Sequence, residues 1–139
     1  MTSSAEPPVD EVELFVVGAH LTGQPLVWQL TERGAVLVGE GRTAPAYRLV
    51  ALPTDPPKPG LLRVGAGGAS IVGERWRVPV AGFGSFVSAV PSPLTIGKVE
   101  LTDGELVCGF LCEAWAAEGA TDISAGGGWL AHLRASAGS

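Results

Sequence analysis

The stretch VELFVVGAHLTGQP, residues 12–25, decides the fold of this chain. Its first part, residues 12–17, is short, rich in β-branched residues and ended by Gly18, which predicts a strand buried on both faces. A glycine at the end of a strand allows a sharp turn, and a helix is predicted to begin at Pro25 and to run to Arg33. The intervening turn leaves successive main-chain N–H groups free to converge on an anion.

This turn carries the main candidate functional residue, His20. An imidazole placed beside exposed main-chain donors can bind a carboxylate and transfer a proton. The backbone around Gly18, Ala19 and Leu21 would then hold the anion, in a loop whose sequence continues to the predicted helix. The alternative is an ordinary strand-to-helix turn with an exposed histidine, and spacing alone favours that alternative.

Alternating and periodic patterns predict the remaining elements. Strands are predicted at residues 35–38, 47–52, 61–64, 74–80, 96–101 and 106–112. The pair Asp103-Gly104 between the last two strands predicts a hairpin. A helix is predicted over residues 83–90, and a last helix around Trp129, with Asp122 or Ser124 as its cap.

The pattern as a whole predicts an α+β fold. Short strands with two or three small helices are typical of a small mixed, mainly antiparallel β-barrel with flanking helices. Residues 54–60 contain three prolines, which a central strand does not accommodate, and predict a surface turn. Residues 1–11 are predicted to form a loose tail, and residues 12–139 a single domain.

Composition and charge exclude several classes of function. The chain has 139 residues and a net charge of −5, and its nine basic residues form no cluster. Binding to a phosphate backbone needs a clustered positive face, so we expect no nucleic acid partner. No apolar run approaches the roughly 18 residues of a membrane span. The first residues also lack the positive start of a secretory signal, so we expect a cytoplasmic protein without membrane contact.

Neither metal nor cofactor chemistry is indicated. Cys108 and Cys112 lie four residues apart in a predicted strand, which separates them by about 13 Å. A disulfide needs Cα atoms within about 7 Å, so both are predicted to be buried free thiols. The two histidines and two cysteines lack zinc-ligand spacing, and no serine has a Gly-x-Ser-x-Gly surround. We expect no metal and no other cofactor.

Two further groups are candidate binding residues. Thr43, Tyr47 and Arg48 place a hydroxyl, a phenol and a guanidinium together, and Arg48 could clamp a carboxylate with two hydrogen bonds. The alternative, a strand-entry turn with a solvated arginine, is somewhat favoured. Glu113 closes the strand at residues 106–112 and would be a partly buried carboxylate usable as an acid or base. Its alternative is a carboxylate that simply reaches solvent.

Several blocks, in order along the chain, carry a family resemblance. They are VVGAHLTGQPL (16–26), TAPAYRL (43–49), PGL (59–61), FGSFV (83–87), PSPLTIG (91–97), VEL (99–101) and GFLCE (109–113). Together they resemble the C-terminal domain of allophanate hydrolase over residues 12–134. That resemblance implies a fold similar to that of γ-glutamylcyclotransferases. Those enzymes bind their substrate with a Tyr-Gly-Ser-Leu-like loop, and the loop Gly18-Ala19-His20-Leu21 of this chain resembles it. His20 stands where those relatives carry serine, and residues 80–90 contain no acid to match their general base.

The resemblance also implies a chemistry. Allophanate hydrolases release ammonia with an amidase domain, and their C-terminal domain is thought to decarboxylate the remaining N-carboxycarbamate. An amidase does not fit in 139 residues, so only the second stage is expected, on a small anionic substrate. In this interpretation His20 donates a proton, main-chain amides hold one carboxylate, and Arg48 or Tyr47 holds the other.

Three alternatives remain open. The chain could be a non-catalytic module that binds small anions, or a stabilising partner of a separately encoded amidase. The scaffold could also serve a different amide or carbamate substrate, because one fold hosts many activities.

The last helix, with its tryptophan, could pack on its own sheet or against another subunit of a homo-oligomer.

Overall fold

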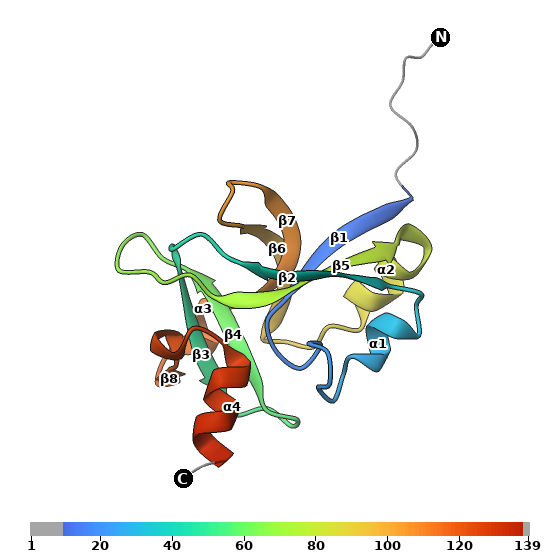
Figure 1. The fold of residues 1–139 in the computed structure, drawn as a ribbon. Helices are drawn as coiled ribbons and strands as arrows, with labels where there is room; N and C mark the ends of the chain where they lie inside the picture. Colours follow the sequence, from blue (N-terminus) through green and yellow to red (C-terminus); the bar gives the residue numbers. More distant parts are fainter. Residues whose placement is uncertain (1–9, 138–139) are drawn as a thin grey trace.

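The computed structural model describes residues 10–137 (Figure 1). Its elements, in chain order, are β1 (Glu11–Val16), α1 (Trp28–Thr31), β2 (Val36–Arg42), β3 (Tyr47–Leu52), β4 (Lys58–Arg63), β5 (Val72–Pro79), α2 (Val80–Ser88), β6 (Leu94–Glu100), β7 (Leu106–Cys112), α3 (Ala114–Ala117), β8 (Thr121–Asp122), the 3₁₀ helix η1 (Ser124–Gly126) and α4 (Trp129–Ala137). In Figure 1, α1 and α2 lie together on one side of the molecule, and α3 and α4 on the opposite side.

The strands form two sheets. The larger has five strands in the order β2-β5-β1-β7-β6, and the smaller has three in the order β4-β3-β8. Every named pair is antiparallel except β1 with β7, in which Leu14 is opposite Cys108. The predicted α+β class with mainly antiparallel sheets is confirmed. Strand pairing among the described residues produces two sheets and does not close them into one barrel.

Strand β1 divides the core between its two faces. Leu14 and Val16 belong to one buried cluster, which includes Phe110 and Trp129, and Phe15 and Val17 belong to the other. Strand β1 is therefore buried on both faces, as its continuous apolar run predicts. Trp129 is 3% exposed, so the last helix packs on its own chain.

The hairpin of β6 and β7 is also confirmed. Glu100 pairs with Leu106, and the turn between them is closed by the Gly104 N–H, which donates to the Leu101 carbonyl at 2.9 Å. Gly104 has a φ of 88°, a conformation that L side chains rarely adopt. The Asp103 carboxylate accepts the Glu105 N–H at 2.9 Å and fixes the same turn.

One prediction was wrong at a place that proves important. The predicted surface turn at residues 54–60 ends early, because β4 begins at Lys58 and its first four residues are buried. Pro59 is tolerated there because β4 is the edge strand of the smaller sheet, where a missing N–H costs no ladder hydrogen bond.

Smaller corrections concern element boundaries. Strand β2 continues through Arg42, beyond the predicted residues 35–38, with an irregular register between Leu37 and Gly39. Helix α1 has only four residues, and turns occupy most of the rest of the predicted helix at residues 25–33. Glu11 lies in β1 and not in a tail, while residues 1–9 lie outside the described residues.

The predicted caps of the last helix serve another element. Asp122 lies in β8, and its carboxylate accepts the Ser124 N–H at 2.8 Å at the start of η1. The Ser124 hydroxyl in turn accepts the Leu49 N–H at 2.8 Å, so this segment is attached to β3 and not to α4. Strand β8 and the four-residue helix α3 are too short to be predicted from periodicity.

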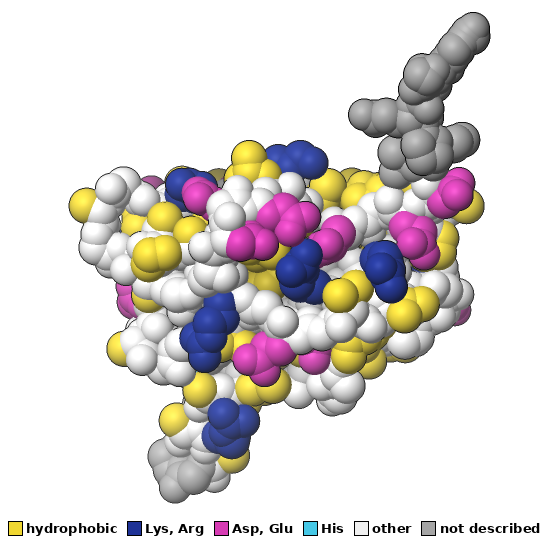
Figure 2. Space-filling view, turned by 45° about the horizontal axis from the view of Figure 1, so that its top comes forward, with side chains coloured by type: hydrophobic (Ala, Val, Ile, Leu, Met, Phe, Trp, Pro, Cys, Tyr) yellow, Lys and Arg dark blue, Asp and Glu magenta, His cyan; other side chains and the backbone are white. Residues whose placement is uncertain are grey.

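The surface carries charges of both signs. Acidic and basic side chains alternate over the face shown in Figure 2, where hydrophobic side chains also reach the surface. Arg75 pairs with both Glu13 and Glu105. Cys108 and Cys112 are free thiols, as predicted, but they are half-buried and not fully buried. No helix within residues 10–137 is long and apolar enough to cross a membrane.

We expect Gly73→Ala to destabilise the fold by about 1–3 kcal/mol. A Cβ at Gly73 would lie 2.4 Å from the Val16 carbonyl oxygen and 2.6 Å from Cζ of Phe15, so buried strands must move apart. The matched control is Gly84→Ala in α2, where a Cβ meets nothing within 4 Å and should stabilise the helix by about 0.5–1 kcal/mol. Urea unfolding measures both values, and shifts in the same direction would contradict this packing.

Candidate functional site

His20 lies buried in the loop that follows β1. The residue is only 7% exposed to solvent. Its ring stacks on the ring of Phe110, with the two centroids 4.9 Å apart and an angle of 18° between the two planes. Phe86 contacts the same ring edge-on at 5.3 Å. The loop is held by the Leu21 N–H donating to the Gly18 carbonyl and the Leu26 N–H donating to the Ala19 carbonyl. The alternative of an exposed histidine in an ordinary turn is therefore wrong.

A hydrogen bond to Gln29 orients the imidazole. Nε2 of His20 lies 2.7 Å from Oε1 of Gln29, which follows Trp28 in α1. A carbonyl oxygen only accepts, so Nε2 carries the proton, and Nδ1 of the neutral ring has the free lone pair. Burial lowers the pKa of His20 below its ordinary value of 6.5; the bond to Gln29 opposes this change, and the positive charge of Lys58 adds to it. The ring is thus neutral near pH 7.

Lys58 is the cationic residue of this region. The residue is only 8% exposed at the start of β4, and within the described residues its side chain forms neither a hydrogen bond nor an ion pair. It borders three adjoining hollows of about 20, 190 and 260 Å³. His20 lines the two smaller hollows, and Thr54, Asp55 and Ser92 line the outer one. A cationic side chain that lines a hollow without a counterion is a candidate to bind an anion.

Three residues with unused main-chain donors line the smallest hollow. The N–H groups of Gly18, Ala19 and His20 are not used in the hydrogen bonds formed within residues 10–137. These three residues share that hollow with Lys58 and Pro59. A Cβ at Gly18 would lie 2.3 Å from Cδ of Pro59, so only glycine lets the loop pack this closely against β4.

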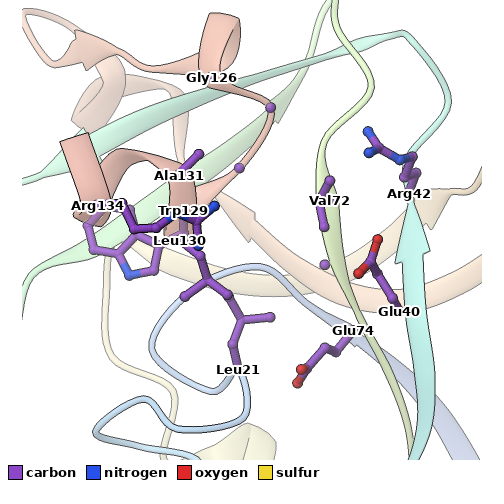
Figure 3. Close-up of a pocket in the computed structure, with 13 residues that line it drawn as sticks. Leu21, Glu40, Arg42, Val72, Glu74, Gly126, Trp129, Leu130, Ala131 and Arg134 are labelled. Carbon is purple, nitrogen blue, oxygen red and sulfur yellow. The ribbon is translucent and has the colours of Figure 1, made fainter.

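The predicted loop residues do not all face this hollow. Gly18, Ala19 and His20 are brought together with Lys58, whereas Leu21 belongs to the first core cluster and is 4% exposed. Leu21 instead lines a separate cavity of about 390 Å³. Figure 3 shows that cavity between Trp129 of α4 and Glu40 and Arg42 of β2. Successive residues of the loop therefore face different cavities.

Thr43, Tyr47 and Arg48 lie elsewhere, which corrects the predicted carboxylate clamp. Thr43 and Tyr47 are fully buried, and their oxygens accept the N–H groups of Ile71 and Glu100, each at 2.9 Å. Nε of Arg48 lies 3.2 Å from the Asp122 carboxylate in β8. None of the three lines a hollow beside His20. Their roles in the described residues are contacts that hold the fold.

Glu113 is exposed, which corrects the expectation of a partly buried carboxylate. Its carboxylate accepts hydrogen bonds from the Ser92 hydroxyl at 3.2 Å and from Nε1 of Trp115 at 3.3 Å. Ser92 lines the outer hollow beside Lys58, but Glu113 does not.

Sequence reasoning missed Lys58 and Gln29. Lys58 stands in the proline-rich stretch predicted to form a turn, and Gln29 lies inside the helix predicted at residues 25–33, where no pattern marks it as a partner of His20. The available signal was a lone lysine directly before the apolar residues Pro59 to Leu62. Within the described residues, no three histidine, cysteine or acidic side chains gather to hold a metal ion.

Comparison with known proteins places this architecture in a family. A model of the allophanate hydrolase C-terminal domain matches residues 12–134, and the chain belongs to that family. The urea amidolyase of Lachancea kluyveri is 47% identical over 131 residues, which are 91% of this chain and 7% of that protein. The crystal structure of the Kluyveromyces lactis urea amidolyase is 44% identical with a TM-score of 0.87, over 91% of this chain and 8% of that one.

A third relative is much shorter. The crystal structure of a protein specific to uropathogenic Escherichia coli is 34% identical with a TM-score of 0.84, over 90% of this chain and 97% of that one. A solved γ-glutamyl cyclotransferase, 15% identical with a TM-score of 0.54 over 75% of this chain, shares the fold alone. The resemblances inferred from the sequence blocks, to both the family and the fold, are thus confirmed.

We expect substitutions of Gln29 to move the pKa of His20 in opposite directions. Gln29→Leu removes the hydrogen bond that raises this pKa and should lower it further. Gln29→Glu places a carboxylate beside Nε2, favours the imidazolium and should raise the pKa. NMR titration of the ring protons measures both, with His20→Asn assigning the resonance. Equal shifts in both variants would show that Gln29 does not contact the ring.

Proposed function

We propose that this chain decarboxylates N-carboxycarbamate, or a similar small dicarboxylated nitrogen compound, in the breakdown of urea through allophanate. One observation carries the proposal: a buried imidazole shares a small hollow with unused main-chain N–H groups and an unpaired ammonium. Membership of the allophanate hydrolase C-terminal domain family supports it. The chain spans 7% of the urea amidolyase of Lachancea kluyveri, so the proposal concerns one step only.

The substrate would enter as a dianion with its nitrogen between two carboxylates. The free N–H groups of Gly18, Ala19 and His20 are suited to hold the carboxylate that stays, because they are fixed before the substrate arrives. The C–N bond to the other carboxylate breaks, carbon dioxide leaves, and the electron pair of that bond remains on nitrogen. The nitrogen must then gain one proton to give carbamate.

His20 would supply that proton. Binding of a dianion beside the ring offsets the burial and the Lys58 charge that lower its pKa, so the neutral ring takes up a proton at Nδ1. Nε2 remains bonded to Gln29, which keeps the ring in place. The imidazolium then donates its Nδ1 proton to the substrate nitrogen and returns to the neutral form. A buried imidazolium with a low intrinsic pKa is a strong acid, which suits this role.

The substrate must come from another activity. An amidase that removes ammonia from allophanate would generate N-carboxycarbamate, and we place such an amidase before this step. A non-catalytic anion-binding module would use the same hollow, but it would bind without turnover.

We expect the chain to accelerate carbon dioxide release from N-carboxycarbamate generated continuously by an isolated amidase. His20→Asn should lower kcat by about 10²–10⁴-fold, the usual contribution of general acid catalysis. Stopped-flow measurement of carbon dioxide, with the amidase in excess, gives the rate.

His132→Asn is the matched control, since His132 is the other histidine of the chain and packs on Trp129 in α4. It should retain full activity. A rate no greater than the spontaneous one would leave an anion-binding role, and full activity of His20→Asn would exclude His20 as the donor.

A further inference from the structure

The burial of Lys58 is unusual for its charge. The chain has two lysines, Lys58 and Lys98, and only Lys58 is buried. Lysine is seldom this enclosed without a partner, and Nζ of Lys58 is not among the completely buried side-chain atoms of the described residues, so its ammonium keeps some contact with solvent through the hollows. Asp55 lines the outer hollow, yet it forms no ion pair with Lys58 within the described residues. The charge therefore lacks a protein counterion.

The surroundings of Lys58 indicate which kind of ligand could supply its counterion. Its side chain borders the hollow of Gly18, Ala19 and His20 on one side and the outer hollow of Thr54 and Ser92 on the other. The adjoining hollows are thus lined by residues with two kinds of hydrogen-bond donor. One kind is the main-chain N–H groups of the loop after β1, and the other is the ammonium of Lys58 at the start of β4. A short molecule with an anionic group at each end can satisfy both kinds of donor at once.

We propose that Lys58 binds the second carboxylate of the substrate and makes the site selective for small dianions over monoanions. This inference rests on the proposed function for the identity of the substrate. It gives to Lys58 the carboxylate predicted from the sequence for Tyr47 or Arg48, because those two residues lie away from His20. Lys58 then acts as a binding residue whose counterion arrives with the ligand.

A structural role for Lys58 predicts the opposite behaviour on substitution. A lysine kept for stability would be paired, and its removal would weaken the fold. A lysine that is unpaired in the empty protein and kept for a ligand adds little to its stability, so replacement by an apolar side chain of similar length should preserve or raise the melting temperature. This difference separates the two roles.

The test compares binding of malonate and of its monoamide, malonamate. Malonate replaces the substrate nitrogen by carbon and cannot release carbon dioxide by the same step, and malonamate has the same shape with one charge fewer near neutral pH. Isothermal titration should show tighter binding of malonate to the unmodified chain. Lys58→Met should weaken malonate binding by about tenfold or more and change malonamate binding by less than about threefold.

Lys98→Met is the matched control. Lys98 is exposed in β6, and its substitution removes the same charge from the chain. It should leave both affinities unchanged. Lys58→Met with a melting temperature at or above that of the unmodified chain supports the proposal.

Equal loss of both ligands, unchanged malonate affinity, or no preference of the unmodified chain for malonate would overturn it. Lys58-dependent malonate binding without any decarboxylation would instead remove the proposed function and leave the dianion site intact.

Discussion

The contact between Gly18 and the ring of Pro59 is the constraint on which the site depends. Gly18 follows β1 of the larger sheet, and Pro59 lies in β4 of the smaller one. A Cβ at Gly18 would overlap the proline ring, so the absence of a side chain sets how near the two segments can come. Because they meet there, His20 and Lys58 border the same hollow.

That hollow gathers positive charge and hydrogen-bond donors without an acid. His20 is kept neutral by burial and by Lys58, and the main-chain N–H groups add further positive potential. While it is empty, such a site gains no stability from these donors, a loss that the extensive apolar packing around β1 offsets. Proteins often accept this loss of stability where a ligand must be recognised.

The sequence predicts the fold where local pattern and tertiary packing agree. The apolar run of β1 and the Asp103-Gly104 hairpin were both predictable for this reason. Residues 58–60 were not, because prolines signal a turn unless the strand is known to be an edge, and edges are a property of the whole sheet. His20 could be nominated from its loop, whereas the orientation of Gln29 in the next segment, and the approach of Lys58 from a distant one, depend on tertiary packing.

The site is assembled from pieces far apart along the chain: the loop after β1, helix α1, the start of β4, and Phe110 of β7. In a partly folded chain, with its two sheets apart, these residues would not lie together and the complete site would not exist. Any molecule that occupies it must consequently favour the native ensemble over every opened form, by an amount that grows with ligand concentration. Occupation of the site by a ligand would thereby lengthen the time that the chain survives proteolysis.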